Sequence, residues 1–332
     1  MFITNSILLT GVGSYLPNDY LTNHDLSKKI ETSDEWISKR SGIKKRHFVS
    51  ANETTSDLAY FAALKAIKSA KLDKNDVDLI IVATTTPDNT FPATAALVQK
   101  KLNINAVSFD VQAVCAGFVF ALSVAKSMML DSFYKNCLVI GADSMSKLLD
   151  WTDRSTSVLF GDGAGAVVLQ KFNTKEFNLD DWGVLSTALF TDGKYYDILK
   201  TNGGVSTNKT VGSIEMLGKE VFKHAVEKLS SSLLNALKIS NKKIDQIDWV
   251  VPHQANQRII TAVADKLKIN HNKIISTVSE HGNTSAASIP LALDNAVLSG
   301  RIVDGNLLAF QAIGGGLSWG ASLVRIGQPK NI

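Results

Sequence analysis

Cysteine is scarce in this chain, which has two cysteines, Cys115 and Cys137, among 332 residues. Neither belongs to a C-x-x-C pair, so the sequence contains no zinc-ribbon or dithiol redox motif. The 6 histidines are scattered without metal-ligand spacing, and we expect no metal site. Two distant cysteines do not form a disulfide framework, so a reducing compartment is the simpler expectation.

Long apolar runs and a strong charge excess are also lacking. No run approaches the roughly 18 residues of a membrane span, and residues 1–5 lack the basic start of a signal peptide. A net charge of +4, from 35 basic and 31 acidic residues, is too small to indicate nucleic-acid binding. We therefore expect a cytoplasmic protein that binds neither membrane nor nucleic acid.

What the chain does contain is an alternation of apolar strands and helical patterns from end to end. This alternation predicts a sheet covered by helices on both faces. In the first half we expect strands over 6–11, 78–83, 106–110 and 136–142, helices over 23–30, 33–43, 55–70 and 91–102, a helix from 116 to about 130, and a glycine-rich turn at 161–165 that leads into a further strand.

The second half repeats the plan of the first at a spacing of 170 residues. The stretch 248–253 resembles 78–83, and 307–312 resembles 137–142. Between these two later strands, the stretch 280–288 takes the place of the stretch around Cys115. The period is far longer than that of a solenoid, so it indicates a duplicated domain with halves 1–175 and 176–332.

Cys115 lies where a predicted strand gives way to a helix. The unpaired N–H groups and the dipole at a helix start favour a thiolate, which is the nucleophilic form of cysteine. The same pattern also fits an unreactive cysteine buried in the core. The second half helps to decide between these interpretations.

In the second half, the equivalent turn carries Asn283, and the strand ending at Pro252 is followed by His253. Turns related by an approximate twofold axis would bring Cys115, His253 and Asn283 to one pocket. A cysteine supplies a covalent nucleophile, and a histidine and an asparagine can donate two hydrogen bonds to a developing oxyanion. Each residue alone could be an ordinary loop or turn residue, but their agreement at matching points of a repeat favours a catalytic site.

Trp36 and Arg40 are four residues apart on the predicted helix 33–43, and so lie on one face of it. The pair either packs against the rest of the domain or binds a purine and its phosphate. The glycine run Gly314–Gly316 either lets the two halves pack closely or offers backbone N–H groups to a ligand.

These motifs resemble the β-ketoacyl-acyl-carrier-protein synthase III family of the thiolase fold. The resemblance implies an α/β protein with a thiolase-like, duplicated five-layer αβαβα sandwich. The most specific matching pieces are Val251-Pro252-His253-Gln254-Ala255-Asn256 and His281-Gly282-Asn283-Thr284-Ser285-Ala286-Ala287-Ser288. Further matches lie at Cys115-Ala116-Gly117-Phe118, at Gly314-Gly315-Gly316, and at 13–17, 32–37, 40–43, 109–111, 152–154 and 160–166, of which the glycine-rich pieces are shared with other thiolase-fold enzymes.

The resemblance also implies an acyltransferase activity, the decarboxylative condensation that initiates fatty acid biosynthesis. Cys115 would accept an acyl group from acyl-CoA, with acetyl-CoA as the expected starter. His253 and Asn283 would bind the thioester carbonyl of malonyl-acyl carrier protein as CO₂ leaves, and the product would be a 3-oxoacyl-acyl carrier protein. The backbone N–H groups of Cys115 and Gly315 match the family's oxyanion hole. No cofactor is implied, because acyl-CoA is a substrate.

Binding residues follow from the same resemblance. The implied contacts are Thr32, Trp36, Arg40 and Arg154 for CoA, Lys223, Gln254 and Arg258 for the acyl carrier protein, and Phe91 for the acyl pocket of the neighbouring subunit in a homodimer. Three departures from the family pattern are Asp265 in a normally basic position, the larger Gln112 and Val114 beside the nucleophile, and Ile313 in place of an aromatic residue.

Two other functions stay open at this point. A related Cys-His-Asn enzyme could transfer acyl groups to oxygen or nitrogen, or condense them in secondary metabolism. A non-catalytic partner subunit of the same fold would usually lack the nucleophile, and the presence of Cys115, His253 and Asn283 argues against it.

Overall fold

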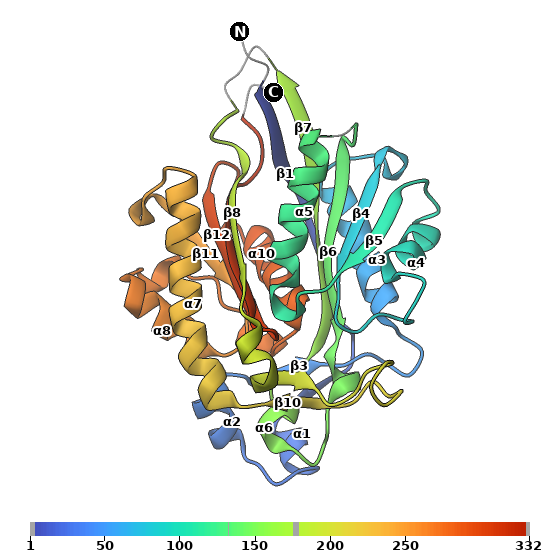
Figure 1. The fold of residues 1–332 in the computed structure, drawn as a ribbon, viewed down its shortest axis with the longest axis vertical. Coiled ribbons are helices and arrows are strands. Elements are labelled where there is room, and N and C mark those ends of the chain that lie inside the picture. Colours follow the sequence, from blue (N-terminus) through green and yellow to red (C-terminus); the bar gives the residue numbers. More distant parts are fainter. Residues whose placement is uncertain (1–3, 132, 175–178, 330–332) are drawn as a thin grey trace.

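Two β-sheets lie side by side, with helices between them and against both outer faces (Figure 1). The computed structural model describes residues 4–131, 133–174 and 179–329. The first sheet contains β1 (Thr4–Tyr15), β4 (Leu79–Ala83), β5 (Val107–Val111), β6 (Asn136–Ser144) and β7 (Asp162–Thr174). The second contains β8 (Gly183–Thr191), β11 (Trp249–Pro252), β12 (Leu307–Gly314) and β13 (Ser318–Arg325).

The second sheet repeats the order of the first. The strand orders are β1-β7-β6-β4-β5 and, read in the same sense, β8-β13-β12-β11. In the first sheet β4 pairs in parallel with both β5 and β6, and in the second β11 pairs in parallel with β12, whereas the other neighbouring strands are antiparallel. The duplicated topology therefore agrees with the spacing of 170 residues. The predicted boundary between residues 175 and 176 lies outside the described residues.

Helices complete a five-layer arrangement, as predicted. One outer layer contains α3 (Thr55–Ser69) and α4 (Thr94–Leu102), the central layer α5 (Gly117–Asp131) and α10 (Ser288–Leu298), and the other outer layer α7 (Gly218–Ile239) and α8 (Gln257–Leu267). The remaining helices are α1 (Asn23–Ser27), α2 (Asp34–Ser41), α6 (Arg154–Ser157) and α9 (Val278–His281), with 3₁₀ turns at Lys74–Asp76, Val114–Ala116, Met145–Leu148, Gly193–Ile198, Ile244–Gln246, His271–Lys273 and Ser285–Ala287. None of these described helices is long and apolar enough to cross a membrane.

The largest hydrophobic core lies between the two sheets, around α5 and α10. Phe118 of α5 and Phe310 of β12 are both fully buried there, with ring centroids 6.2 Å apart in an edge-on arrangement. Burial of one such side chain contributes about 1.5–3 kcal/mol. Because this core contains residues from both sheets, it holds the two halves together and fixes the relative positions of their turns.

Two equivalent turns begin the central helices. The turn Val114–Ala116 leads into α5, and the turn Ser285–Ala287 leads into α10. Each turn starts with a residue in the left-handed region, Val114 and Ser285, both with φ of 50°. Such a conformation costs a non-glycine residue about 1–3 kcal/mol and is concentrated at functional sites. The sequence repeat thus corresponds to a repeat of strained backbone.

Several predicted elements need correction. The strand predicted as buried over 106–110 is β5, and its residues are only partly buried because β5 is the edge strand of the first sheet. The helix predicted over 91–102 begins only at Thr94. The helix predicted over 23–30 ends at Ser27 and is capped by Thr22.

The glycines at 161–165 do not form the predicted turn, because β7 already begins at Asp162. Their small size is needed for packing against the central layer. A Cβ atom on Gly165 would lie 2.7 Å from the backbone of Pro290 and Leu291 in α10. Glycine therefore allows α10 to lie directly on β7.

A short ribbon of β9 (Leu199–Thr201) and β10 (Ile214–Met216) lies outside both sheets. A second ribbon pairs β2 (Tyr20–Thr22) with β3 (Lys45–His47). Sequence reasoning did not predict β9 and β10, and they contribute residues to the cavity described next.

Candidate active site

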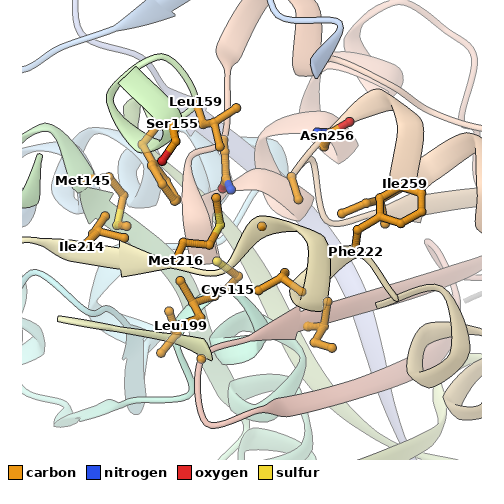
Figure 2. A pocket seen from close by; sticks show the side chains of 18 of the residues that line it. Cys115, Met145, Ser155, Leu159, Leu199, Ile214, Met216, Phe222, Asn256 and Ile259 are labelled. Atoms are coloured by element: carbon orange, nitrogen blue, oxygen red, sulfur yellow. The ribbon is translucent and has the colours of Figure 1, made fainter. Parts of the chain in front are cut away.

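A cavity of about 730 Å³ is lined by residues from both halves of the chain, and it contains the predicted catalytic residues. Cys115, His253, Asn283 and Gly315 all line it. Figure 2 shows Cys115 close to Met216 and Leu199, with Phe222, Ile259 and Asn256 further along the same cavity. The structure thus brings together four residues that are far apart in the sequence.

Cys115 is 5% exposed and lies in the 3₁₀ turn Val114–Ala116 that leads directly into α5. Burial raises the pKa of its thiol to about 12, while the Ser285 hydroxyl and the amide of Cys115 act in the opposite direction. The nearby carboxylate of Asp143 raises that pKa further. Burial and the Asp143 charge therefore outweigh the effect of the helix start, which was expected to favour the thiolate.

His253 follows β11 and is held from two sides. Its backbone N–H donates to the carbonyl oxygen of Gln311 over 2.8 Å, and its Nδ1 lies 2.6 Å from the Oγ of Ser288. Burial lowers the pKa of the imidazole to about 3, so the ring is neutral at physiological pH.

The Ser288 hydroxyl can pair with either tautomer of this neutral ring, because its oxygen accepts from the backbone N–H of Gln254 over 3.2 Å and still has a hydrogen and a second lone pair. In the tautomer in which Nδ1 accepts the Ser288 hydrogen, the ring proton is on Nε2, and His253 offers one N–H donor from that nitrogen.

Asn283 is fixed by the backbone around it. It bridges to Phe160, with its N–H donating to Leu159 over 2.9 Å and its carbonyl accepting from Gly161 over 3.0 Å. The backbone N–H of Ser285 donates to Asn283 Oδ1 over 2.9 Å. Because Oδ1 is an acceptor there, the side-chain amide presents its N–H₂ group as a donor.

The glycine run lies directly against the nucleophile. A Cβ atom on Gly314 would be 2.6 Å from the backbone nitrogen of Cys115, and one on Gly315 would be 2.8 Å from the carbonyl oxygen of Leu199. Only glycine permits these close approaches. The backbone of Gly314 therefore lies beside the Cys115 amide, and Gly315 lies between Leu199 and Val114.

Trp36 and Arg40 of α2 also line the cavity. The guanidinium carbons of Arg40 and Arg154 lie 5.3 Å and 5.1 Å from the Trp36 ring centroid. Arg154 additionally donates to the carbonyl oxygen of Glu31 over 3.0 Å. Thr32, in contrast, is not among the lining residues, and its buried hydroxyl has no hydrogen-bond partner.

The three residues that were predicted to contact the carrier protein differ in their exposure to solvent. Lys223 of α7 and Arg258 of α8 are exposed, and Arg258 lines the cavity. Gln254 is 1% exposed: its amide donates to Pro252 over 2.6 Å and to Ile275 over 3.2 Å, and accepts from the Thr277 N–H over 2.8 Å. The expectation that Gln254 contacts a carrier protein is therefore wrong, because the amide satisfies buried backbone groups.

Phe91 does not line the cavity of its own chain, and its side chain is 82% exposed. Asp265, which departs from the family pattern, lies 2.7 Å from Nε2 of His271.

One side of the cavity is an apolar wall that was not predicted from the sequence. Met145, Leu148, Phe160 and Ile214 form a buried cluster, partly covered by Leu199, that lines one side of the cavity. Lys219, near the start of α7, is a further lining residue. The apolar side chains come from a loop, a 3₁₀ turn and short strands, where no periodic pattern marks them.

The fold and the site together define a thiolase-like condensing enzyme, a class of acyltransferase. Residues 109–193 match the family model described as 3-oxoacyl-[acyl-carrier-protein] synthase III, and residues 237–326 match the model of its C-terminal part. The chain is 52% identical to the β-ketoacyl-[acyl-carrier-protein] synthase III of Paramagnetospirillum magneticum over 98% of this chain and 100% of the relative.

The enzyme of the same name from Ehrlichia canis is 54% identical, over 96% of this chain and 99% of the relative. The crystal structure of 3-oxoacyl-[acyl-carrier-protein] synthase III from Aquifex aeolicus superimposes with a TM-score of 0.88 at 43% identity, covering 97% of this chain and 100% of that one. The chain belongs to the β-ketoacyl-acyl-carrier-protein synthase III family, and the resemblance drawn from the sequence is confirmed.

Proposed function

We propose that this protein condenses an acyl-CoA with malonyl-acyl carrier protein, releasing CO₂ and CoA, to form a 3-oxoacyl-acyl carrier protein that starts fatty acid synthesis. The observation that carries the proposal is the meeting of Cys115, His253 and Asn283 in one cavity. Acyl-CoA and malonyl-acyl carrier protein are substrates, and no further cofactor enters the reaction. Two free cysteines are compatible with a cytoplasmic location.

The first half-reaction moves the acyl group to the enzyme. The sulfur of Cys115 attacks the thioester carbonyl of acyl-CoA, and the carbonyl oxygen becomes an oxyanion. The backbone N–H groups of Cys115 and Gly315 stabilise that charge, and CoA leaves as the thioester with Cys115 forms. The apolar wall of Met145, Leu148 and Ile214 accommodates the acyl chain.

The second half-reaction forms the carbon–carbon bond. Loss of CO₂ from the malonyl group leaves negative charge on the thioester oxygen of the resulting enolate. His253 Nε2–H and the Asn283 amide donate to that oxygen, and the enolate carbon attacks acyl-Cys115. Both donors are neutral, so they stabilise the developing charge without adding a buried positive charge to the site.

Trp36, Arg40 and Arg154 bind the nucleotide of CoA in this proposal. The two arginines already lie on the indole, and an adenine could stack against the same group of side chains. The exposed cations Lys223 and Arg258 attract the acidic carrier protein, although the carboxylate of Asp265 lowers the net positive charge of α8.

The enzyme acts as a homodimer in this proposal. β5 is an edge strand whose residue Val107 is 47% exposed, and Phe91 is 82% exposed. A second copy of the chain would pair with the open edge and cover these apolar side chains.

One assay tests the proposed function as a whole. The protein is incubated with a panel of acyl-CoAs and malonyl-acyl carrier protein, and the products are identified by mass. A 3-oxoacyl-acyl carrier protein with matching release of CO₂ is the expected result. Acyl transfer to an oxygen or nitrogen acceptor without CO₂ release would favour the acyltransferase alternative instead.

Trp36→Ala tests the nucleotide contact. Stacking of a base on an aromatic side chain is worth about 1–3 kcal/mol, so kcat/KM for acyl-CoA should fall about tenfold, since 1.4 kcal/mol corresponds to one factor of ten. An acyl-pantetheine thioester, which lacks the nucleotide, should be used at nearly the parent rate. The two substrates are compared by steady-state kinetics.

Trp151→Ala is the matched control, because Trp151 is also partly exposed and packs edge-on against Phe48 with ring centroids 5.7 Å apart. It should leave both substrates unaffected. Equal losses with acyl-CoA and acyl-pantetheine in Trp36→Ala would indicate that the indole only supports the fold.

A further inference from the structure

Arg46 of β3 is a fully buried arginine that neither half-reaction uses. In the part of the chain that the structure describes, no aspartate or glutamate pairs with its guanidinium. Burial lowers the pKa of the side chain to about 10, so the group is still charged at physiological pH. A buried charge without a partner of opposite sign is costly and calls for an explanation.

The hydrogen bonds of this guanidinium point in two directions. Its Nη2 donates to the carbonyl oxygen of Val158 over 2.7 Å. Its Nη1 donates to Asn23 Oδ1 over 2.8 Å and, less closely, to the carbonyl oxygen of Leu21 over 3.3 Å. Val158 is the C-terminal cap of α6, the helix that begins with Arg154. One arm of Arg46 therefore holds the end of α6.

The other arm of Arg46 reaches α2 through the side-chain amide of Asn23, which is 1% exposed. The Nδ2 group of Asn23 donates to Asp34 Oδ1 over 2.7 Å and to the carbonyl oxygen of Ile43 over 2.7 Å. Asp34 is the first residue of α2, and Ile43 follows the glycine that caps its end. Arg46 is thus connected to both helices whose arginines lie on the Trp36 ring.

The segment that follows α6 also holds Asn283. The backbone N–H of Asn283 donates to the carbonyl oxygen of Leu159, and its own carbonyl oxygen accepts from Gly161. The stem of Arg46 packs close to both flanks of this contact, since a Cβ atom on Gly161 would lie 3.1 Å from the Cβ of Arg46, and one on Gly282 would lie 3.0 Å from it. Arg46 therefore lies against the backbone that fixes Asn283.

We propose that Arg46 is a positioning residue that fixes the nucleotide clamp, formed by Trp36, Arg40 and Arg154, relative to Asn283. The planar guanidinium suits this role, because its donors point in fixed and divergent directions. One rigid group then sets the distance between the part of the cavity that binds CoA and the donor that binds the malonyl thioester. This inference rests on the proposed function, because it concerns the sites of the two half-reactions.

Loss of the guanidinium should displace both sites while leaving the nucleophile in place. Cys115 lies on a separate turn at the start of α5, which the hydrogen bonds of Arg46 do not reach. A displacement of about 1 Å in an active site can cost about 10²-fold in rate. A merely structural role would instead reduce the amount of folded protein and leave each folded molecule fully active.

The experiment compares Arg46→Met with the parent protein per active site. Folded sites are first counted by intact mass, as the fraction of Cys115 that is acylated at saturating acyl-pantetheine, a substrate that does not use the nucleotide clamp. For each counted site, release of ¹⁴CO₂ from malonyl-acyl carrier protein should fall about 10²-fold. The preference for acyl-CoA over acyl-pantetheine in kcat/KM should fall about tenfold, as in Trp36→Ala.

Double variants show whether Arg46 acts through the two sites that it connects. Arg46→Met combined with Asn283→Ala should release CO₂ no more slowly than Asn283→Ala alone, because residues that act as one unit give non-additive losses. In the same way, adding Arg46→Met to Trp36→Ala should not lower the preference for acyl-CoA any further. Losses that multiply in either combination would overturn the proposed coupling.

Arg325→Met is the matched control, because Arg325 also joins loops, donating to the carbonyl oxygens of Asp181 over 2.7 Å and Gly305 over 2.8 Å, and does not line the cavity. It should lower the melting temperature and leave both activities per site unchanged. Arg46→Lys keeps the charge and the stem without the planar fork, so it should show both losses even where Arg46→Met fails to fold. Parent activities per site in either variant of Arg46 would overturn the inference, whereas a parent protein that releases no CO₂ would instead refute the proposed function.

Discussion

Replacing Cys115 with serine should abolish formation of the acyl-enzyme. A serine hydroxyl is a far weaker acid and a weaker nucleophile than a thiol. Loss of the nucleophile in covalent hydrolases costs on the order of 10⁶-fold in rate. Intact-mass measurement after incubation with acyl-CoA should therefore show a full adduct on the parent protein and none on Cys115→Ser.

Cys137→Ala provides the control for that result. Cys137 is fully buried in β6, and burial raises the pKa of its thiol well above the ordinary value. It does not line the cavity, so the variant should acylate like the parent. An adduct mapped by peptide mass to Cys137 would show that the nucleophile has been assigned to the wrong residue.

The fold could be predicted well from the sequence because duplication preserves local patterns. Apolar runs at 78–83 and 248–253 mark β4 and β11, and the runs at 137–142 and 307–312 mark β6 and β12. Once these pairs are recognised, the turns between them are equivalent by topology. Because of that equivalence, the sequence alone predicts that Cys115 and Asn283 lie in one site.

The features of the site that could not be predicted from the sequence depend on contacts between distant segments. The ribbon of β9 and β10 consists of three-residue strands without a pattern of their own, yet it lines the cavity. Gln254 looks like a surface residue, and its burial follows from backbone groups of Ile275 and Thr277. The helix start at Cys115 is visible in the sequence, whereas the burial and the Asp143 charge that raise the thiol pKa are not.

The second large effect is expected for Asn283→Ala, which should separate the two half-reactions. Acylation of Cys115 uses the thiol and the backbone N–H groups of Cys115 and Gly315, so it should proceed at nearly the parent rate. Decarboxylation loses one of its two donors to the enolate oxygen. Removal of one oxyanion donor typically costs about 10²–10³ in rate, and condensation should slow by the same factor.

His253→Ala should slow decarboxylation to a similar extent, since it removes the other donor. Asn283→Asp sharpens the comparison, because a carboxylate of nearly the same shape can still accept from the Ser285 N–H but offers no N–H₂ to the enolate. Its negative charge would also repel the developing oxyanion, so this variant should be slower than Asn283→Ala. The measurements are acylation by intact mass and release of ¹⁴CO₂ from malonyl-acyl carrier protein, each on every variant.

The order of these rates distinguishes the mechanism from its competitor. Donation to an enolate requires decarboxylation to decrease from the parent protein to Asn283→Ala and further to Asn283→Asp, while acylation stays nearly constant. If Asn283→Ala released CO₂ at the parent rate, Asn283 would serve only to hold the turn at Ser285 in place. The enzyme would then resemble a simple acyltransferase, in which Cys115 passes its acyl group to an oxygen or nitrogen acceptor without loss of CO₂.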